Sequence, residues 1–111
     1  MELIRKPTRQ EEGLIKFLIT KAFKNINIGQ ELLVRSMNDG NMGGLYLYPF
    51  GIIDKKRFLG ELVSECQFID EDGVKVIASL NVDQDGQIFE VDIWKTDFSP
   101  LIKIPEPESW C

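Results

Sequence analysis

Hydrophobic and polar residues alternate along residues 62–94 in the way typical of β-strands, and two turn signals divide this stretch into three parts. The turns are Glu71-Asp72-Gly73 and Asp85-Gly86. The pattern therefore predicts a three-strand antiparallel meander in the C-terminal half of the chain.

The register of this meander follows from the requirement that apolar residues share one face. A two-residue turn at Asp85-Gly86 and a three-residue loop at residues 71–73 meet this requirement, with Ser64 as the one polar residue among the apolar ones. The resulting pairs are Val82 with Phe89, Leu80 with Val91, Ala78 with Ile93, Phe68 with Val76, Cys66 with Ala78, Ser64 with Leu80 and Leu62 with Val82.

Side-chain alternation then defines the opposite face of the meander. Three rows are expected there: Glu65 with Ser79 and Asp92, Val63 with Asn81 and Glu90, and Gln67 with Ile77 and Trp94. Glu65 and Asp92 should lie about 10 Å apart, one on each side of Ser79. This face is the best candidate binding surface, and its candidate residues are Glu65, Asn81, Glu90, Asp92 and Trp94.

Trp94 has two open interpretations. Exposed aromatic residues beside charges are enriched at protein contacts. The C-terminal segment Phe98-Ser99-Pro100-Leu101-Ile102 could instead cover its ring.

The N-terminal part of the chain predicts a helix. Thr8 and Glu11 have capping-box spacing, and apolar residues then recur at intervals of three, four and seven to about Lys24. The helical apolar positions are Leu14, Ile15, Leu18, Ala22 and Phe23, and Gly13 weakens the helix without breaking it.

Two further strands are expected at Glu31–Met37 and Leu45–Tyr48, with Pro49 ending the second. The glycine-rich run between them lacks the lysine and hydroxyl residue of a phosphate loop, so it is interpreted as a connection. A ligand-contacting role stays open for Asn38, Asp39, Gly40 and Asn41. Lys55-Lys56-Arg57 is interpreted as a solvated basic turn.

Residues 81–92 also match a calcium-loop pattern, with oxygen side chains at the first, third and fifth positions and Gly86 at the sixth. However, an EF-hand requires flanking helices, whereas both flanks here are β-branched and alternating. A plain hairpin is therefore favoured, and no metal or cofactor is expected.

Composition excludes several classes of chemistry. The chain has no histidine, which removes Ser-His and Cys-His catalysis and histidine zinc sites. The formal charge of −5 disfavours nucleic-acid binding but permits a basic partner. No apolar run is long enough to cross a bilayer and no secretory signal is present, so we expect a cytoplasmic protein without a membrane partner.

The segments Met37–Leu45 and Asp85–Leu101 resemble stretches of a small bacterial family of unknown function. The similarity covers nearly the whole chain. The resemblance implies no catalytic residues, because the shared motifs are those of turns and strands. Small acidic domains of this kind are similar to immunity proteins that neutralise toxins.

Together these patterns predict one α+β domain over residues 1–111, with an N-terminal helix packed on a mainly antiparallel sheet of four to six strands. The leading functional hypothesis is a non-enzymatic domain that binds a basic protein, for example as an immunity-like inhibitor of a toxin. The alternatives are a structural or homodimeric domain and, less favoured, a small-molecule enzyme.

Overall fold

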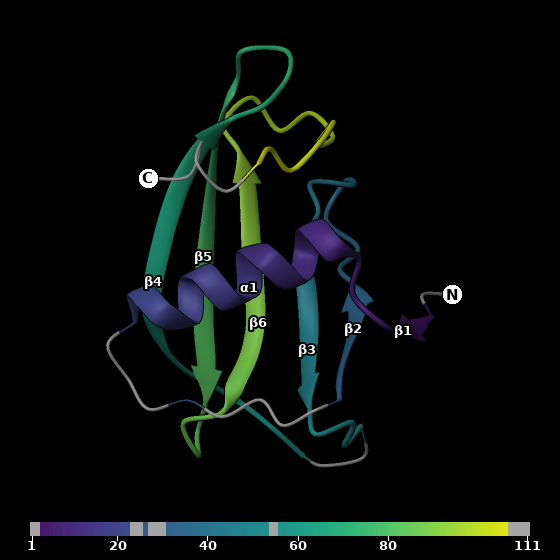
Figure 1. The fold of residues 1–111 in the computed structure, drawn as a ribbon, viewed down its shortest axis with the longest axis vertical. Coiled ribbons are helices and arrows are strands. Elements are labelled where there is room, and N and C mark those ends of the chain that lie inside the picture. Colours follow the sequence, from purple (N-terminus) through teal and green to yellow (C-terminus); the bar gives the residue numbers. More distant parts are fainter. Residues whose placement is uncertain (1–2, 23–25, 27–30, 54–55, 107–111) are drawn as a thin grey trace.

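The fold is a six-strand antiparallel sheet with one helix lying across one face (Figure 1). It is seen in a computed structural model that describes residues 3–22, 26, 31–53 and 56–106. The strand order is β1-β2-β3-β6-β5-β4, so the C-terminal meander forms one half of the sheet. The elements are β1 (Ile4–Arg5), α1 (Arg9–Lys21), β2 (Leu32–Ser36), β3 (Leu45–Pro49), β4 (Leu59–Ile69), β5 (Lys75–Asp83) and β6 (Ile88–Lys95).

The helix begins as predicted. The Thr8 hydroxyl accepts the Glu11 amide at 3.1 Å, and the Glu11 carboxylate accepts the Thr8 amide at 2.8 Å, which completes the capping box. The expected end near Lys24 is wrong, because α1 ends at Lys21; Phe23 and Lys24 lie outside the described residues.

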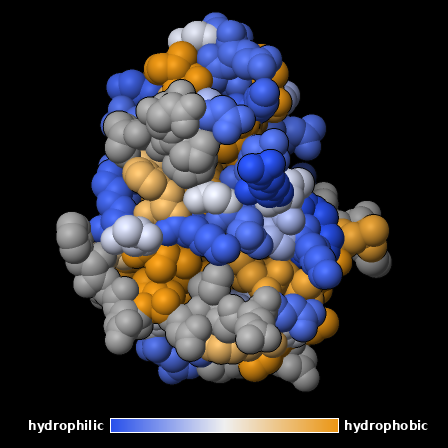
Figure 2. All heavy atoms as spheres, in the orientation of Figure 1, coloured by the Kyte–Doolittle hydropathy of each residue, from blue (hydrophilic) through white to orange (hydrophobic). Residues whose placement is uncertain are grey.

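One side of α1 supplies the helical layer of the hydrophobic core. Leu14, Ile15 and Leu18 are buried against the sheet, and the opposite side of the helix forms a hydrophilic band across this face (Figure 2). The sheet contributes apolar residues from five of its strands. They are Leu32, Val34, Leu45, Leu47, Cys66, Phe68, Val76, Ala78, Leu80, Ile88, Val91 and Ile93.

The central part of the predicted register is confirmed. Leu80 lies opposite Val91 and Ser64, and Ala78 lies opposite Ile93 and Cys66. The three-residue loop at 71–73 is also confirmed, because the Asp70 amide bonds to the Val74 carbonyl and Gly73 has a φ of 83°. Ser64 is buried as expected, and its hydroxyl donates to the Leu18 carbonyl of α1 at 2.7 Å.

The register is wrong at the other end of the meander. Val82 pairs with Ile88 rather than Phe89, because the β5–β6 loop has three residues and closes on Asp83 and Gln87. A bulge next to Asn81 then restores the predicted pairing.

Leu62 was also expected in the core, opposite Val82. A second bulge, between Leu62 and Ser64, places Leu62 opposite Asn81 on the uncovered face, where its side chain is 55% exposed. The predicted alternation of core-facing side chains on β4 therefore holds only from Ser64 onward.

Candidate functional site

No described element covers the face of the sheet opposite α1, so the meander side chains that point there define the candidate site. Two of the predicted rows are confirmed, namely Glu65 with Ser79 and Asp92, and Gln67 with Ile77 and Trp94. In the third row Asn81 lies opposite Glu90 as predicted, but Leu62 takes the place expected for Val63.

Asn81 joins the carboxylates of this face. Its Nδ2 donates to Glu90 Oε1 at 3.3 Å and to Asp92 Oδ2 at 3.1 Å, and only 6% of the residue is exposed. The Ser79 hydroxyl lies 3.4 Å from Glu65 Oε2. Glu65, Glu90, Asp92, Asn81 and Ser79 are called the carboxylate cluster below.

The carboxylates of this cluster lack ion-pair partners in the described structure, although Lys21 Nζ donates to the backbone carbonyl of Glu65 at 2.6 Å. Among the described residues, no ion pair joins Glu65, Glu90 or Asp92 to a lysine or arginine. Burial and the nearby charge of Asp92 raise the pKa of Glu90, and the hydrogen bond from Asn81 offsets only part of this effect. Within the part of the chain that the structure describes, these like charges therefore lie near one another without an ion-pair partner.

Sequence reasoning missed two neighbours of the cluster, Tyr46 and Arg35. Tyr46 lies opposite Glu90 on β3, and Arg35 lies opposite Tyr46 on β2 with its guanidinium 4.6 Å from the ring centroid. Because β3 and β6 are far apart in sequence, no local pattern could have predicted this pairing.

Trp94 stands at the end of the face nearest the C-terminal segment. Its side chain is 44% exposed, and its ring centroid lies 6.1 Å from that of Phe98 with the planes tilted by 50°. Each of the two open interpretations is therefore partly correct. The C-terminal segment contacts the Trp94 ring through Phe98, and much of Trp94 stays accessible.

The glycine-rich connection lies apart from the carboxylate cluster and has a structural network of its own. The Asp39 carboxylate accepts the Met42 amide at 3.1 Å and the Gly44 amide at 2.9 Å. The Asn41 carbonyl accepts the Leu101 amide, so this loop holds the C-terminal segment. Asn38 and Gly40 are exposed at its tip.

A buried ion pair occupies the segment that resembled a calcium loop. Arg57 Nε lies 2.8 Å from Asp83 Oδ2, while Asp83 Oδ1 accepts the amides of Asp85 and Gln87. The interpretation of Arg57 as part of a solvated turn is wrong, because its side chain is buried in this pair. The sequence favours a plain hairpin over a calcium loop at Asp83, but it does not predict this ion pair. Within the described part of the chain, no group of three or more metal-binding side chains is arranged to hold an ion.

A second buried network fixes the C-terminal segment. The Lys95 ammonium lies 2.8 Å from Asp70 Oδ2 and 2.6 Å from Asp72 Oδ2, and it donates to the Pro100 carbonyl at 3.0 Å. Burial acts to lower the pKa of Lys95, but its hydrogen bonds with the two carboxylates outweigh this and raise it. Asp70 also accepts the amides of Ile102 and Lys103.

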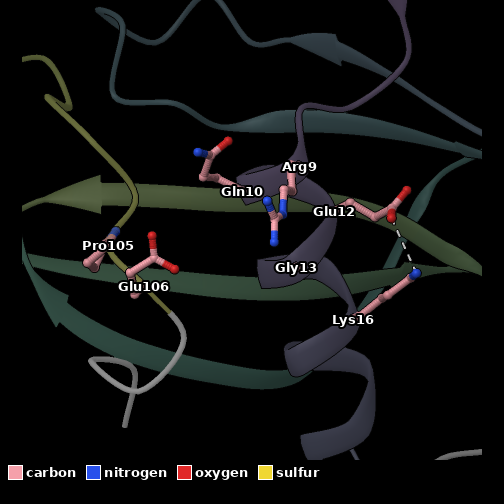
Figure 3. Close-up of a pocket in the computed structure, with 7 residues that line it drawn as sticks. All are labelled: Arg9, Gln10, Glu12, Gly13, Lys16, Pro105 and Glu106. Atoms are coloured by element: carbon pink, nitrogen blue, oxygen red, sulfur yellow. Dashed lines mark hydrogen bonds and ion pairs between the residues drawn. The ribbon is translucent and has the colours of Figure 1, made fainter.

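A shallow hollow of about 380 Å³ lies on the helix side, between α1 and the C-terminal segment (Figure 3). Glu106 points toward the helix, and Glu12 and Lys16 pair with each other at 3.3 Å. Its charges are mixed and partly paired within α1, so the hollow offers a less distinctive site than the carboxylate cluster. It is lined by Arg9, Gln10, Glu12, Gly13, Lys16, Pro105 and Glu106.

None of the helices in the described residues is long and apolar enough to cross a membrane. Searches for similar proteins found no matching curated protein and no matching solved structure. One family does match, over residues 4–105, and its description is Domain of unknown function (DUF6984). This match spans both of the segments that resembled a family of unknown function, and the chain accordingly belongs to the DUF6984 family.

Proposed function

We propose that the uncovered face of the sheet binds a basic protein, and that the chain acts through this binding rather than through catalysis. The observation that carries the proposal is the unneutralised carboxylate cluster, in which Glu65, Glu90 and Asp92 have no cationic partner among the described residues. A lysine or arginine from a partner would supply the missing charge, and complementary charge speeds association and selects partners.

The surroundings of the cluster support a protein partner rather than a small molecule. The cluster lies on an open sheet face, whereas small-molecule sites are usually concave and enclose most of their ligand. Large exposed apolar side chains share this face: Leu62 lies opposite Asn81, Trp94 lies two residues from Asp92, and Ile69 lies farther along β4. Carboxylates beside exposed aromatic and aliphatic groups fit a protein contact.

An enzymatic role has weaker support. Glu65 and Asp92 share one row of the sheet, but a pair of catalytic carboxylates needs an enclosed site that separates their pKa values. The pKa of Glu90 is raised by burial and by the charge of Asp92, but its carboxylate faces Asn81 rather than a cavity. Inhibition of a basic toxin in the manner of an immunity protein is one form that the proposed binding would take in a bacterial cell.

The test is capture of proteins from the source organism with three baits: the wild-type chain, a cluster variant and a charge-matched control. The cluster variant is Glu65→Gln with Glu90→Gln and Asp92→Asn. The control is Glu12→Gln with Glu71→Gln and Glu106→Gln, which changes the net charge by the same amount on exposed residues elsewhere.

We expect wild type and control to enrich the same basic protein, and the cluster variant to lose most of that enrichment. Association of this basic protein with the wild-type chain should also slow as salt is added. Equal enrichment by all three baits would place the functional surface elsewhere. A self-associating wild type whose assembly is lost in Trp94→Ala would favour the homodimer instead.

A further inference from the structure

Phe98 has a backbone conformation that phenylalanine rarely adopts. Its φ is 63°, in the left-handed region where a Cβ atom is disfavoured, and 69% of the residue is exposed. Glycine would fit this position with less strain, and burial of the ring contributes little. Strain of this kind motivates a functional hypothesis, which the neighbours of the side chain must then support.

The strained turn presents the Phe98 ring next to Trp94. The two ring centroids are 6.1 Å apart, and both side chains are accessible at the same end of the uncovered face. Asp92 precedes Trp94 by two residues on β6, so it points to the same face about 7 Å away. An aromatic surface thus adjoins the carboxylate cluster.

This aromatic pair stands on a rigid base. The Phe98 amide donates to the Lys95 carbonyl at 2.7 Å, and the Asp97 carboxylate accepts the Ser99 amide at 3.0 Å. Lys95 itself is fully buried between Asp70, Asp72 and the Pro100 carbonyl. A surface held in this way loses little conformational freedom when it binds.

We propose that the Trp94–Phe98 pair receives an apolar side chain of an extended partner segment that carries lysine or arginine two positions away. This inference rests on the proposed function. On an extended chain, side chains two positions apart lie about 7 Å apart on one face, which matches the spacing of the aromatic pair from Asp92. Glu65 lies in the same row of the sheet as Asp92, with Ser79 between them.

Charge decides against a second copy of this chain as the occupant. The chain carries a formal charge of −5, so docking a second copy on the carboxylate cluster would bring like charges together. A cationic segment meets the opposite condition, since its charges approach carboxylates that lack cationic partners in the described structure.

The inference is tested by titrating the ¹⁵N-labelled protein with two synthetic peptides and following amide and indole chemical shifts. Both peptides have seven residues, an acetylated N-terminus, an amidated C-terminus and lysine at positions one and three. Their other positions are serine, except that one of the two peptides has leucine at position five. We expect the leucine peptide to bind wild type on the order of fivefold more tightly, as partial burial of one aliphatic side chain allows.

Two single variants locate the effect. Phe98→Ala should abolish the preference for the leucine peptide. Phe50→Ala is the matched control and should keep it. Phe50 has a φ of 62° and is exposed, but it follows the end of β3, which runs antiparallel to β6 and so ends at the other end of the sheet from Trp94. Phe98→Gly should melt at a temperature no lower than wild type, since it relieves the strained conformation.

The possible failures can be told apart. If both peptides bind equally and the cluster variant abolishes both, the aromatic anchor is overturned and the proposed function stands. If the cluster variant binds both peptides as wild type does, or if wild type binds neither, both proposals fail. A lower melting temperature for Phe98→Gly, or a dimer that Phe98→Ala dissolves, would also overturn the anchor.

Discussion

Arg57 joins three strands at its end of the sheet. Its guanidinium pairs with Asp83 and donates to the backbone carbonyls of Leu47 and Ile88, so one side chain links β3, β5 and β6. It also lies 5.0 Å from the centroid of the Phe89 ring. In sequence Arg57 belongs to a basic run, and nothing local distinguishes it from Lys56, which is exposed.

This pair makes stability depend on pH. Burial acts to raise the pKa of Asp83, but the bonds from Arg57 and from the Gln87 and Asp85 amides outweigh it and lower the pKa. Because the pKa in the fold lies below that of the unfolded chain, the ionised carboxylate stabilises the fold above about pH 4. That contribution is lost as the pH falls through the lowered pKa.

We therefore expect Asp83→Asn to reduce the free energy of unfolding by about 3–5 kcal/mol at pH 7, since Arg57 would keep a buried charge without its partner. The difference from wild type should shrink below about pH 4. Urea unfolding at pH 7 and pH 3 measures both quantities. Asp92→Asn, on the exposed face, serves as the control; an equal loss in that variant would refute the special role of Asp83.

At the scale of elements, alternation predicted the meander well where the strands are regular. The pairs around Ala78 and Leu80 follow from side-chain period alone, and so does the placement of Glu65 and Asp92 on one face. Alternation fails at bulges, because an inserted residue reverses the faces and leaves no mark in hydropathy. Leu62 and Phe89, both assigned to the core, stand beside such bulges.

The corrected register predicts a sharp contrast between two leucines. Leu80 is fully buried, so Leu80→Ala should reduce the free energy of unfolding by about 2–5 kcal/mol. Leu62→Ala should change it by no more than about 0.5 kcal/mol, because the side chain is exposed on the uncovered face. Chemical denaturation of both variants checks the contrast, and comparable losses would restore the register with Leu62 in the core.

Pairing between distant strands was beyond prediction from sequence. The helix, its cap and the hairpins are local features, whereas the contact of β3 with β6 joins residues far apart in the chain. That contact brings Tyr46 and Arg35 to the edge of the carboxylate cluster. The sequence thus predicted the residues that the meander contributes to the candidate site, but not those contributed by β2 and β3.

On the scale of the whole molecule, a single helix leaves one face of the sheet without a covering element among the described residues. A sheet face without a covering layer needs polar residues to remain soluble, and carboxylates serve that purpose. Solubility does not require them to be packed against one another, however. The joint contact of Asn81 with Glu90 and Asp92 concentrates negative charge where dispersed charge would stabilise better.

The central claim is that these carboxylates are kept for a partner rather than for the fold. The pKa of Glu90 is raised by burial and by Asp92, so its ionised form destabilises the folded state. This penalty is present at neutral pH and disappears as the pH falls through the raised pKa. Neutralising the residue should remove the penalty, as is common where stability is given up for function.

The most direct measurement is the melting temperature of Glu90→Gln against wild type from pH 7 to pH 4, with Glu12→Gln as the exposed control. We predict a rise of a few degrees for Glu90→Gln at pH 7, a difference that closes toward pH 4, and no rise for Glu12→Gln. A fall in the melting temperature of Glu90→Gln at pH 7 would contradict the account, because the Glu90 carboxylate would then be stabilising the sheet.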